Sequence, residues 1–518
     1  MFRTWRLLIP WLVLLLAAGC SVGPNYVEPE IEVPDVWLET TAEEVADSTL
    51  VMWWTSLGDT TLTQLMRRAE MANLDLAQAV ARVREVRAFR RIAKGDNLPD
   101  VVVGGAYTRT LISENGQQGN LVGDGGVFDN PTGVWNVNAG VSWEIDVFGR
   151  IRRQVEAATA DLEASVEDYR DVLVSLYAEV GVNYVDVRTF QRRMDFALAN
   201  ELAQQGSVQI TEDRFSAGLT SALDVAQAQS NLANTQATIP ALDAQLVAAR
   251  NRLSVLMGEP PGSLDAMLAD TTLRVDFYEP ERDPAGLPAD LLRRRPDVRR
   301  AERQLAAQTA RIGETTALLY PSFSIAGFLG MESVELGDLF KGGSFAWGLV
   351  PGFSWNIFQG GKIRGQIAVE QARTEQLLLA YEHSVLLALE ETENAMAAFD
   401  RETQRRNRLL EAVEASQRSV DLVRTQYLSG LTNFQNLLDS QRSLFGQQDQ
   451  MAESQGQVFR NLISLNRALG GGWDLESGAP DEDPELAGNR VDEEPDKDRD
   501  EDAGDSANEE ADEEGGER

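Results

Sequence analysis

The side chains that carry most covalent and metal chemistry in proteins are almost absent from this sequence. Its 518 residues include one cysteine, Cys20, and one histidine, His383. One copy of each removes Cys–His nucleophile pairs, most Ser-His-Asp arrangements, structural zinc sites and disulfide frameworks. His383 lies in a helical pattern, where a lone histidine is usually a surface or packed residue and not a ligand. We therefore predict a protein that is not an enzyme and has no catalytic residues, no metal site and no bound cofactor.

The lone cysteine ends a segment typical of exported bacterial proteins. Residues 1–19 carry two arginines and then an apolar run, 7–18, that is too short for a membrane-spanning helix but suits a signal peptide. The run ends in LAAGCS at 16–21, which resembles a lipobox, the site where a bacterial lipoprotein is cleaved and its cysteine acylated. We predict removal of residues 1–19 and a covalent lipid, a diacylglycerol and an N-acyl chain, on Cys20. Serine at position 21 favours transport to the outer membrane.

The charge of the chain argues against nucleic acid as a partner. The sequence holds 47 Lys and Arg against 82 Asp and Glu, a formal net charge of −35. Residues 474–518 alone carry 21 acids and 4 bases. Such strong self-repulsion with few apolar residues predicts that the tail, 471–518, is disordered. A solvated, variable tail and a tail that binds cations or a partner are both compatible with this composition.

The body of the chain is duplicated. VSWEI at 141–145 recurs as FSWNI at 353–357, and RFSAGLT at 214–220 recurs as QYLSGLT at 426–432. Both matches are 212 residues apart, far more than the period of a solenoid repeat. The predicted segments are a lipidated N-terminal segment, a first repeat, a linker and a second repeat, at 20–61, 62–258, 259–287 and 288–470.

Each half contains two stretches in which apolar side chains alternate with small or polar ones. The clearest has apolar residues at every other position from Val137 to Val147. This period suits either a half-buried soluble sheet or a transmembrane β-barrel, and aromatic residues near the strand ends favour the barrel. Four strands cannot close a barrel, because the smallest have about eight, so the barrel must be shared between chains. The four predicted strands lie at about 101–107, 137–147, 323–329 and 347–357.

A very long helical pattern follows each second strand. From Arg150 to about Arg214 the apolar residues step by seven or by alternating fours and threes, the pattern of a coiled-coil seam, and charges occur throughout. A second helix is predicted from Ala222 to about Met257, and the other half repeats this pair from about Lys362. Such helices suit a soluble bundle or the wall of a long tube below a barrel. Strands that feed directly into them favour the tube.

Four short runs, in order along the chain, resemble one family. Over about residues 20–472 the sequence is similar to the outer-membrane factors of tripartite efflux and secretion systems, the TolC-like family, and most of all to the lipoprotein branch that includes NodT and OprM. The runs are CSVGPNY at 20–26, WWTSLGD at 53–59, DLLRRRPDVR at 290–299 and YPSF at 320–323.

The resemblance implies an α+β membrane protein that works as a homotrimer. Three chains would form one twelve-stranded transmembrane β-barrel, four strands from each, continued by a long periplasmic α-helical barrel with an equatorial belt. The implied function is the exit duct of an efflux system, which passively conducts substrates that an inner-membrane pump of the resistance–nodulation–division class delivers through a periplasmic adaptor. The alternatives are a duct for type I protein secretion and, less favoured, a periplasmic coiled-coil lipoprotein without a pore. The single histidine and cysteine oppose a lipid-anchored hydrolase.

In this family the lower helix ends coil inward to close the tube, so the resemblance also implies gate residues. Asp439 matches the constricting acidic position, and Arg442, one turn further on, could pair with it within or between chains. Three copies of Asp439 would form a carboxylate ring that attracts cations. Gln435 and Asn436 replace an apolar and an acidic residue of the branch, which suggests a wetter closure. Asp224 begins the matching helix in the first half, as part of the same gate or as a helix N-terminal acid.

Two turns resemble the tips that dock the adaptor. In each, glycine permits a left-handed backbone, leucine offers an exposed apolar knob, and threonine can cap the following helix. A simple helix–turn–helix connection would need the same residue types. The predicted docking residues are Gly218, Leu219, Thr220, Gly430, Leu431 and Thr432.

Overall fold

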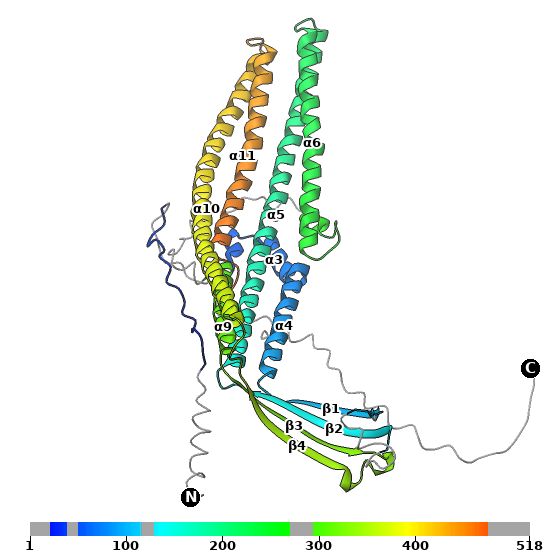
Figure 1. Cartoon of the computed structure of the whole chain (residues 1–518). Coiled ribbons are helices and arrows are strands. Elements are labelled where there is room, and N and C mark those ends of the chain that lie inside the picture. Colours follow the sequence, from blue (N-terminus) through cyan, green and yellow to red (C-terminus); the bar gives the residue numbers. More distant parts are fainter. Residues whose placement is uncertain (1–20, 39–49, 114, 117–128, 270–293, 475–518) are drawn as a thin grey trace, which may run out of the picture. The chain divides into compact units, whose positions relative to one another are not determined.

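Two pairs of long helices dominate the computed structural model (Figure 1). The first helices of the pairs, α5 and α10, have 67 residues each, and the second, α6 and α11, have 35 each. At a rise of 1.5 Å per residue, α5 and α10 are each about 100 Å long. In chain order, α5, α6, α10 and α11 span Arg150–Ser216, Ala222–Leu256, Lys362–Leu428 and Phe434–Ala468. The predicted long helices are confirmed, and their bounds recur 212 residues apart.

The structure describes residues 21–38, 50–113, 115–116, 129–269 and 294–474. The predicted signal peptide, Cys20 and nearly all of the acidic tail lie outside these residues. So do most of the predicted linker and the first four residues of the DLLRRRPDVR run. All described residues belong to one unit, Met1–Ser477.

Shorter helices precede the strands in both halves. The first half has a 3-10 helix, η1, and the α-helices α3 and α4, whereas the second has α9. These four span Trp53–Leu57, Thr60–Ala72, Leu74–Gly95 and Pro296–Ala317, and a one-turn helix, α7, spans Asp265–Leu268. Each half therefore has the order helix, strand, strand, long helix, shorter helix, which confirms the internal duplication.

The four strands form one antiparallel sheet in the order β1-β2-β3-β4. They span Asp100–Thr110, Thr132–Ile145, Ser322–Ser333 and Phe345–Ser354. The halves join where β2 pairs with β3, with Val141 opposite Gly327. The predicted strand ends at Val147 and Ile357 were wrong. The N–H groups of these residues donate to the carbonyls of Ile145 and Trp355, at 2.9 and 3.0 Å, and the resulting three-residue turns end the ladder.

The sheet has exposed apolar side chains in the single chain. Val103 on β1, and Trp347 and Phe353 on β4, are all exposed. Because β1 and β4 are the two edges of the sheet, each also presents unpaired backbone groups on one side. Such a surface needs lipid or a further chain to cover it. Among the described helices, none is long and apolar enough to cross a bilayer.

The main apolar core lies where the short helices of the first half meet α5. The rings of Trp53 and Trp54 are edge to face with centroids 5.7 Å apart, and Trp54 lies 4.6 Å from Tyr177 of α5. In the same run, Asp59 caps α3 by accepting from the backbone N–H groups of Thr61 and Leu62, at 2.7 and 3.1 Å. The WWTSLGD run therefore builds both the core and the start of α3.

The described part of the DLLRRRPDVR run ties α9 to α11. Pro296 is the first residue of α9, where its missing N–H costs nothing. The buried guanidinium of Arg295 donates to Asp297 at 3.0 and 2.7 Å and to the carbonyl of Ala468, the last residue of α11, at 3.1 Å. Glu391 of α10 also pairs with Arg295, at 2.8 Å. One arginine thus joins three helices.

Candidate functional site

The predicted docking residues lie in the two turns that join the helices of each pair. We call these turns the first tip (residues 217–221) and the second tip (residues 429–433). Gly218 and Gly430 have φ of 71° and 75°, a left-handed conformation that favours glycine. The exposed fraction is 67% for Leu219 and 79% for Leu431. Since each long helix begins beside the sheet and ends at a tip, the tips and the sheet lie at opposite ends of α5 and α10.

The prediction that Thr220 and Thr432 cap the following helices was wrong. The N-cap residues are their neighbours, Ser221 for α6 and Asn433 for α11. The threonines stand one position earlier and contact the first helical turn from outside it. Thr220 Oγ1 donates to Asp224, and Thr432 Oγ1 accepts from Asn436 Nδ2 at 2.8 Å.

Asp224 completes a capping box at the first tip. Its backbone N–H donates to Ser221 Oγ at 3.3 Å, and its Oδ2 accepts from the backbone N–H of Ser221 at 3.3 Å. The described contacts of Asp224 are therefore those of a helix N-terminal acid. Asn436 occupies the equivalent place at the second tip, so the two tips share a shape and differ in charge.

Three of the predicted gate residues form an exposed stripe along α11. Gln435, Asp439 and Arg442 follow one another at helical spacings of four and three, and all three are exposed. Asp439 Oδ1 accepts from Gln435 Nε2 at 2.9 Å. The opposite face of the helix, with Phe434, Leu437 and Leu438, is buried.

Arg442 binds another helix and not its neighbour on α11. Its Nε donates to Asn231 Oδ1 on α6 at 2.8 Å. Within one chain, no ion pair joins Asp439 to Arg442 in the part that the structure describes. The expectation of a pair within the chain is therefore not met. Asn231 was not among the predicted residues, because its partner lies 211 positions away and no local pattern marks it.

A second connection near the tips was also missed. Arg214, at the end of α5, donates from Nη1 to the carbonyl of Tyr427 at 3.1 Å, and its guanidinium lies 4.8 Å from the Tyr427 ring centre. Arginine thereby satisfies a carbonyl at the C-terminal end of α10. A comparison of the two repeats could have drawn attention to Arg214, because the equivalent position in the second half is the uncharged Gln426.

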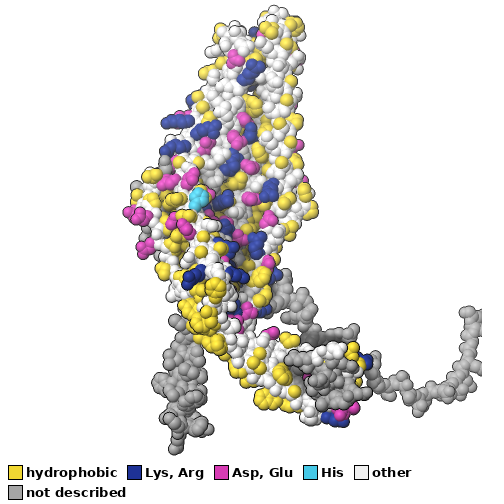
Figure 2. All heavy atoms as spheres, in the orientation of Figure 1, with side chains coloured by type: hydrophobic (Ala, Val, Ile, Leu, Met, Phe, Trp, Pro, Cys, Tyr) yellow, Lys and Arg dark blue, Asp and Glu magenta, His cyan; other side chains and the backbone are white. Residues whose placement is uncertain are grey.

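Charged residues of both signs are mixed elsewhere on the helices. Figure 2 shows acidic and basic side chains interspersed along the helices, with the exposed His383 among them. In the described residues, no group of three His, Cys, Asp or Glu is placed to hold a metal ion.

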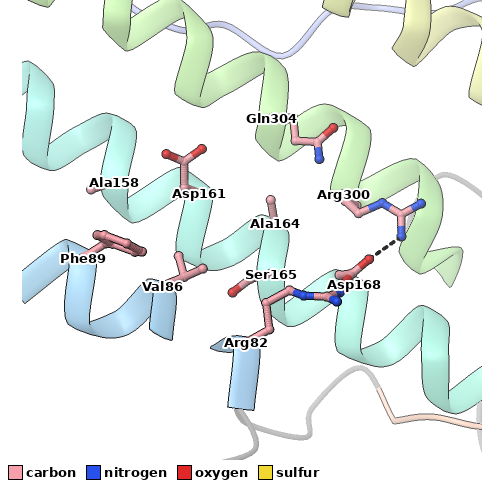
Figure 3. A pocket seen from close by; sticks show the side chains of 10 residues that line it. All are labelled: Arg82, Val86, Phe89, Ala158, Asp161, Ala164, Ser165, Asp168, Arg300 and Gln304. Atoms are coloured by element: carbon pink, nitrogen blue, oxygen red, sulfur yellow. Dashed lines mark hydrogen bonds and ion pairs between the residues drawn. The ribbon is translucent and has the colours of Figure 1, made fainter. Parts of the chain in front are cut away.

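A groove of about 430 Å³ lies over α5 between α4 and α9 (Figure 3). Asp168 accepts from Arg82 at 2.7 Å and from Arg300 at 2.9 Å. Asp171 also pairs with Arg300, although burial raises the pKa of this carboxyl group. These charges neutralise one another, so the groove is a structural junction of three helices. Its lining residues are Arg82, Val86, Phe89, Ala158, Asp161, Ala164, Ser165, Asp168, Arg300 and Gln304.

Comparison with known proteins agrees with this architecture. The model of the outer membrane efflux protein family matches residues 65–259 and 287–471. Nodulation protein T of Rhizobium leguminosarum bv. trifolii is 32% identical over 471 residues, which cover 91% of this chain and 98% of the relative. The toluene efflux pump outer membrane protein TtgF of Pseudomonas putida is 29% identical over 475 residues, 89% of this chain and 96% of the relative.

A solved structure of the outer-membrane channel OprN has a TM-score of 0.79 and 34% identity, covering 88% of this chain and all of that one. The predicted fold class, a duplicated α+β subunit of an outer-membrane channel, is therefore confirmed, as is the predicted location in the outer membrane with a large periplasmic helical part. The predicted efflux function is confirmed as well. The chain belongs to the outer membrane efflux protein family.

Proposed function

We propose that this chain is the exit duct of a tripartite efflux system and works as a homotrimer. The observation that carries this proposal is a four-stranded sheet with two free edges, feeding two pairs of helices of which the longer are about 100 Å. Three copies supply twelve strands, enough to close a barrel, with edge β4 of one copy against edge β1 of the next. The helices of the three copies continue this duct as a tube in the periplasm.

The tips are the proposed contact with the periplasmic adaptor. Leu219 and Leu431 stand exposed on turns whose backbone is held by hydrogen bonds from their own N–H groups, to the carbonyls of Arg214 and Gln426 at 2.8 and 2.9 Å. A rigid turn with an exposed apolar side chain loses little conformational entropy on binding. An inner-membrane pump of the resistance–nodulation–division class would deliver substrate through this adaptor.

The proposed gate is the exposed stripe of α11. Three copies of Asp439 would meet around the threefold axis and form a carboxylate ring that attracts cations. Gln435 and Asn436 beside it are polar, so the closed mouth would hold water rather than an apolar plug. Asp224 contributes negative charge nearby, although its own carboxylate is engaged in the capping box.

Cys20 is the proposed lipid anchor. Its neighbour Ser21 packs against Gly149, just before α5, and the N–H of Val22 donates to the carbonyl of Phe148 at 3.2 Å. The described chain after the cysteine is therefore fastened beside the sheet, where acyl chains can reach the bilayer.

Ion selectivity in planar bilayers tests the gate. Asp439→Asn should lower the K⁺ over Cl⁻ permeability ratio of purified trimers by at least about twofold, because the ring loses its charge. Asp421→Asn is the matched control. Asp421 on α10 is also exposed and also accepts from a glutamine four residues earlier, Gln417, at 3.2 Å. If both variants keep the wild-type ratio, Asp439 does not line the constriction.

A further inference from the structure

One polar contact near the second tip crosses between the two repeats. Arg442 on α11 is exposed, and its Nε donates to Asn231 Oδ1 on α6 at 2.8 Å. Asn231 itself is only 6% exposed. This hydrogen bond joins two helices that otherwise touch little, since each packs mainly on the long helix of its own pair.

Asn231 is a costly residue to bury at this position. Its Nδ2 is buried and has no hydrogen-bond partner among the described residues. An unpaired buried donor destabilises a fold, so an apolar residue would suit packing alone better. Of the two polar atoms in the side chain, only the amide oxygen has a hydrogen-bond partner among the described residues, the guanidinium of Arg442.

The spacing of Asp439 and Arg442 would otherwise favour an ion pair. Among the described residues, three other acids form ion pairs with an arginine three residues later on the same helix, at 2.8 to 2.9 Å. These pairs are Glu167–Arg170, Glu370–Arg373 and Glu402–Arg405. At the tip, Asp439 accepts from Gln435 instead, and the guanidinium of Arg442 is turned to α6.

We infer that Asn231 is a positioning residue that holds Arg442 away from Asp439 and so keeps the carboxylate ring uncompensated. The inference rests on the proposed function, in which Asp439 lines the constriction. An arginine free to pair with Asp439 would neutralise the charge that attracts cations. Asn231 thereby acts on ion selectivity without facing the ions.

The sequence contains this arrangement once, and the duplication does not repeat it around the first tip. The positions equivalent to Asp439 and Arg442 in α6 are Gln227 and Ser230, and the position equivalent to Asn231 in α11 is Ser443. The acid, the arginine and the amide that restrains it therefore occur together only around the second tip. Because the equivalent positions around the first tip carry other residue types, the packing that the two hairpins share does not require them.

Bilayer recordings of full-length trimers in a KCl gradient test the inference. Asn231→Leu removes the acceptor and frees Arg442, so the K⁺ over Cl⁻ permeability ratio should fall by about two- to fivefold. Asn231→Asp keeps an acceptor, so its ratio should stay at or above the wild-type value. Adding Arg442→Gln to Asn231→Leu should restore the ratio, because no cation is left to neutralise Asp439.

Ser207→Ala is the control for a merely structural effect. It removes the hydrogen bond from Gln441 Nε2 to Ser207 Oγ, 2.9 Å long and also buried, which ties α11 to α5 without involving Arg442. This variant should keep the wild-type ratio. If Asp439→Asn alone lowers the ratio and Asn231→Leu alone keeps the wild-type ratio, the inference about Asn231 is wrong, whereas the proposed role of Asp439 in the gate stands. Normal ratios for both overturn the gate itself. Should Asn231→Leu yield no trimer, Asn231→Ala replaces it with the same expected result.

Discussion

At the scale of single residues, the tips are held by hydrogen bonds that join separate helices. Arg214 links α5 to the end of α10, and Arg442 links α11 to α6. In both cases a guanidinium meets a neutral oxygen, whose attraction is weaker than that of a carboxylate. Contacts of this kind can break and form again as a duct opens and closes.

Removing Arg442 should therefore loosen the closed state. In Arg442→Ala the tie between α6 and α11 is lost, and we expect single-channel conductance or open probability to rise by about two- to fivefold. Cation preference should persist, because Asp439 keeps its charge. Arg408→Ala serves as control, since Arg408 is a highly exposed arginine of α10 paired with Glu411. Equal recordings from both variants would contradict a role of Arg442 in closure.

Asp297 offers a prediction about pH. Burial raises the pKa of its carboxyl group, but hydrogen bonds and charge from Arg295, the N–H of Val298 and the charge of Arg300 outweigh this and hold the pKa below its ordinary value. A lowered pKa in the folded state means stability that is present above the unfolded value, about 4, and is lost as pH falls through the folded value.

Asp297→Asn should accordingly lower the free energy of unfolding by about 1–3 kcal/mol at pH 7. The difference from wild type should shrink as the pH falls below about 4, because the native carboxyl group becomes protonated as well. Thermal unfolding of detergent-solubilised protein from pH 3 to pH 7 measures this. Asp75 holds the same second position in α4 that Asp297 holds in α9, but it is exposed, so Asp75→Asn should change stability little at pH 7.

At the scale of elements, the two helical hairpins show how closely duplication preserves geometry. Both tips have a left-handed glycine, an exposed leucine and a threonine that contacts the first turn of the next helix. Their difference lies in that turn, where the first tip carries Asp224 and the second Asn436. An adaptor would therefore meet two similar shapes of unequal charge.

Adaptor binding should depend on the two exposed leucines. Leu219→Asn together with Leu431→Asn should weaken binding of an adaptor cloned from the neighbouring genes by about tenfold or more, because two apolar contacts are lost. Leu422→Asn on α10 changes a leucine before the second tip that is 65% exposed, close to the 67% of Leu219, and should leave the affinity as it is. Surface plasmon resonance with immobilised trimers compares the three proteins. An unchanged affinity for the double variant would place docking elsewhere.

For the whole molecule, the main feature is a sheet that a single chain leaves uncovered. Its sheet has two unpaired edges and exposed apolar side chains, whereas its helices share an apolar core. The barrel proposed for three copies covers both edges at once. Lipid on Cys20 would hold each copy at the membrane before that barrel closes.

Cys20→Ala should leave a trimer that folds and reaches the membrane but is held there less firmly before insertion. Radiolabelled palmitate should mark the wild-type protein and not the variant, and more of the variant should appear in the soluble periplasmic fraction soon after synthesis. Cysteine is absent from the rest of the chain, so the label reports on this residue alone. A wild-type protein without label would rule out lipidation.

Local patterns in the sequence were enough to determine the long helices, the four strands and the duplication. The starts of α5 at Arg150 and of α10 at Lys362 agree with the prediction. The seven-residue period of a helical seam can be recognised from a continuous stretch of sequence. Composition alone, with one cysteine and one histidine, argued against Cys–His nucleophile pairs, structural zinc sites and disulfide frameworks. The gate and docking residues came from the family resemblance, and they stay predictions.

The polar contacts between separate helices were decided by the tertiary structure. Arg442 could have paired with Asp439 three residues before it, yet it binds Asn231 on another helix. Strands β2 and β4 end before the predicted Val147 and Ile357. The backbone N–H groups of these two residues bond within short turns and not to a neighbouring strand. Periodicity reports which face of an element is apolar, but a hydrogen bond depends on the distance between two atoms, and that distance is set only when the helices pack.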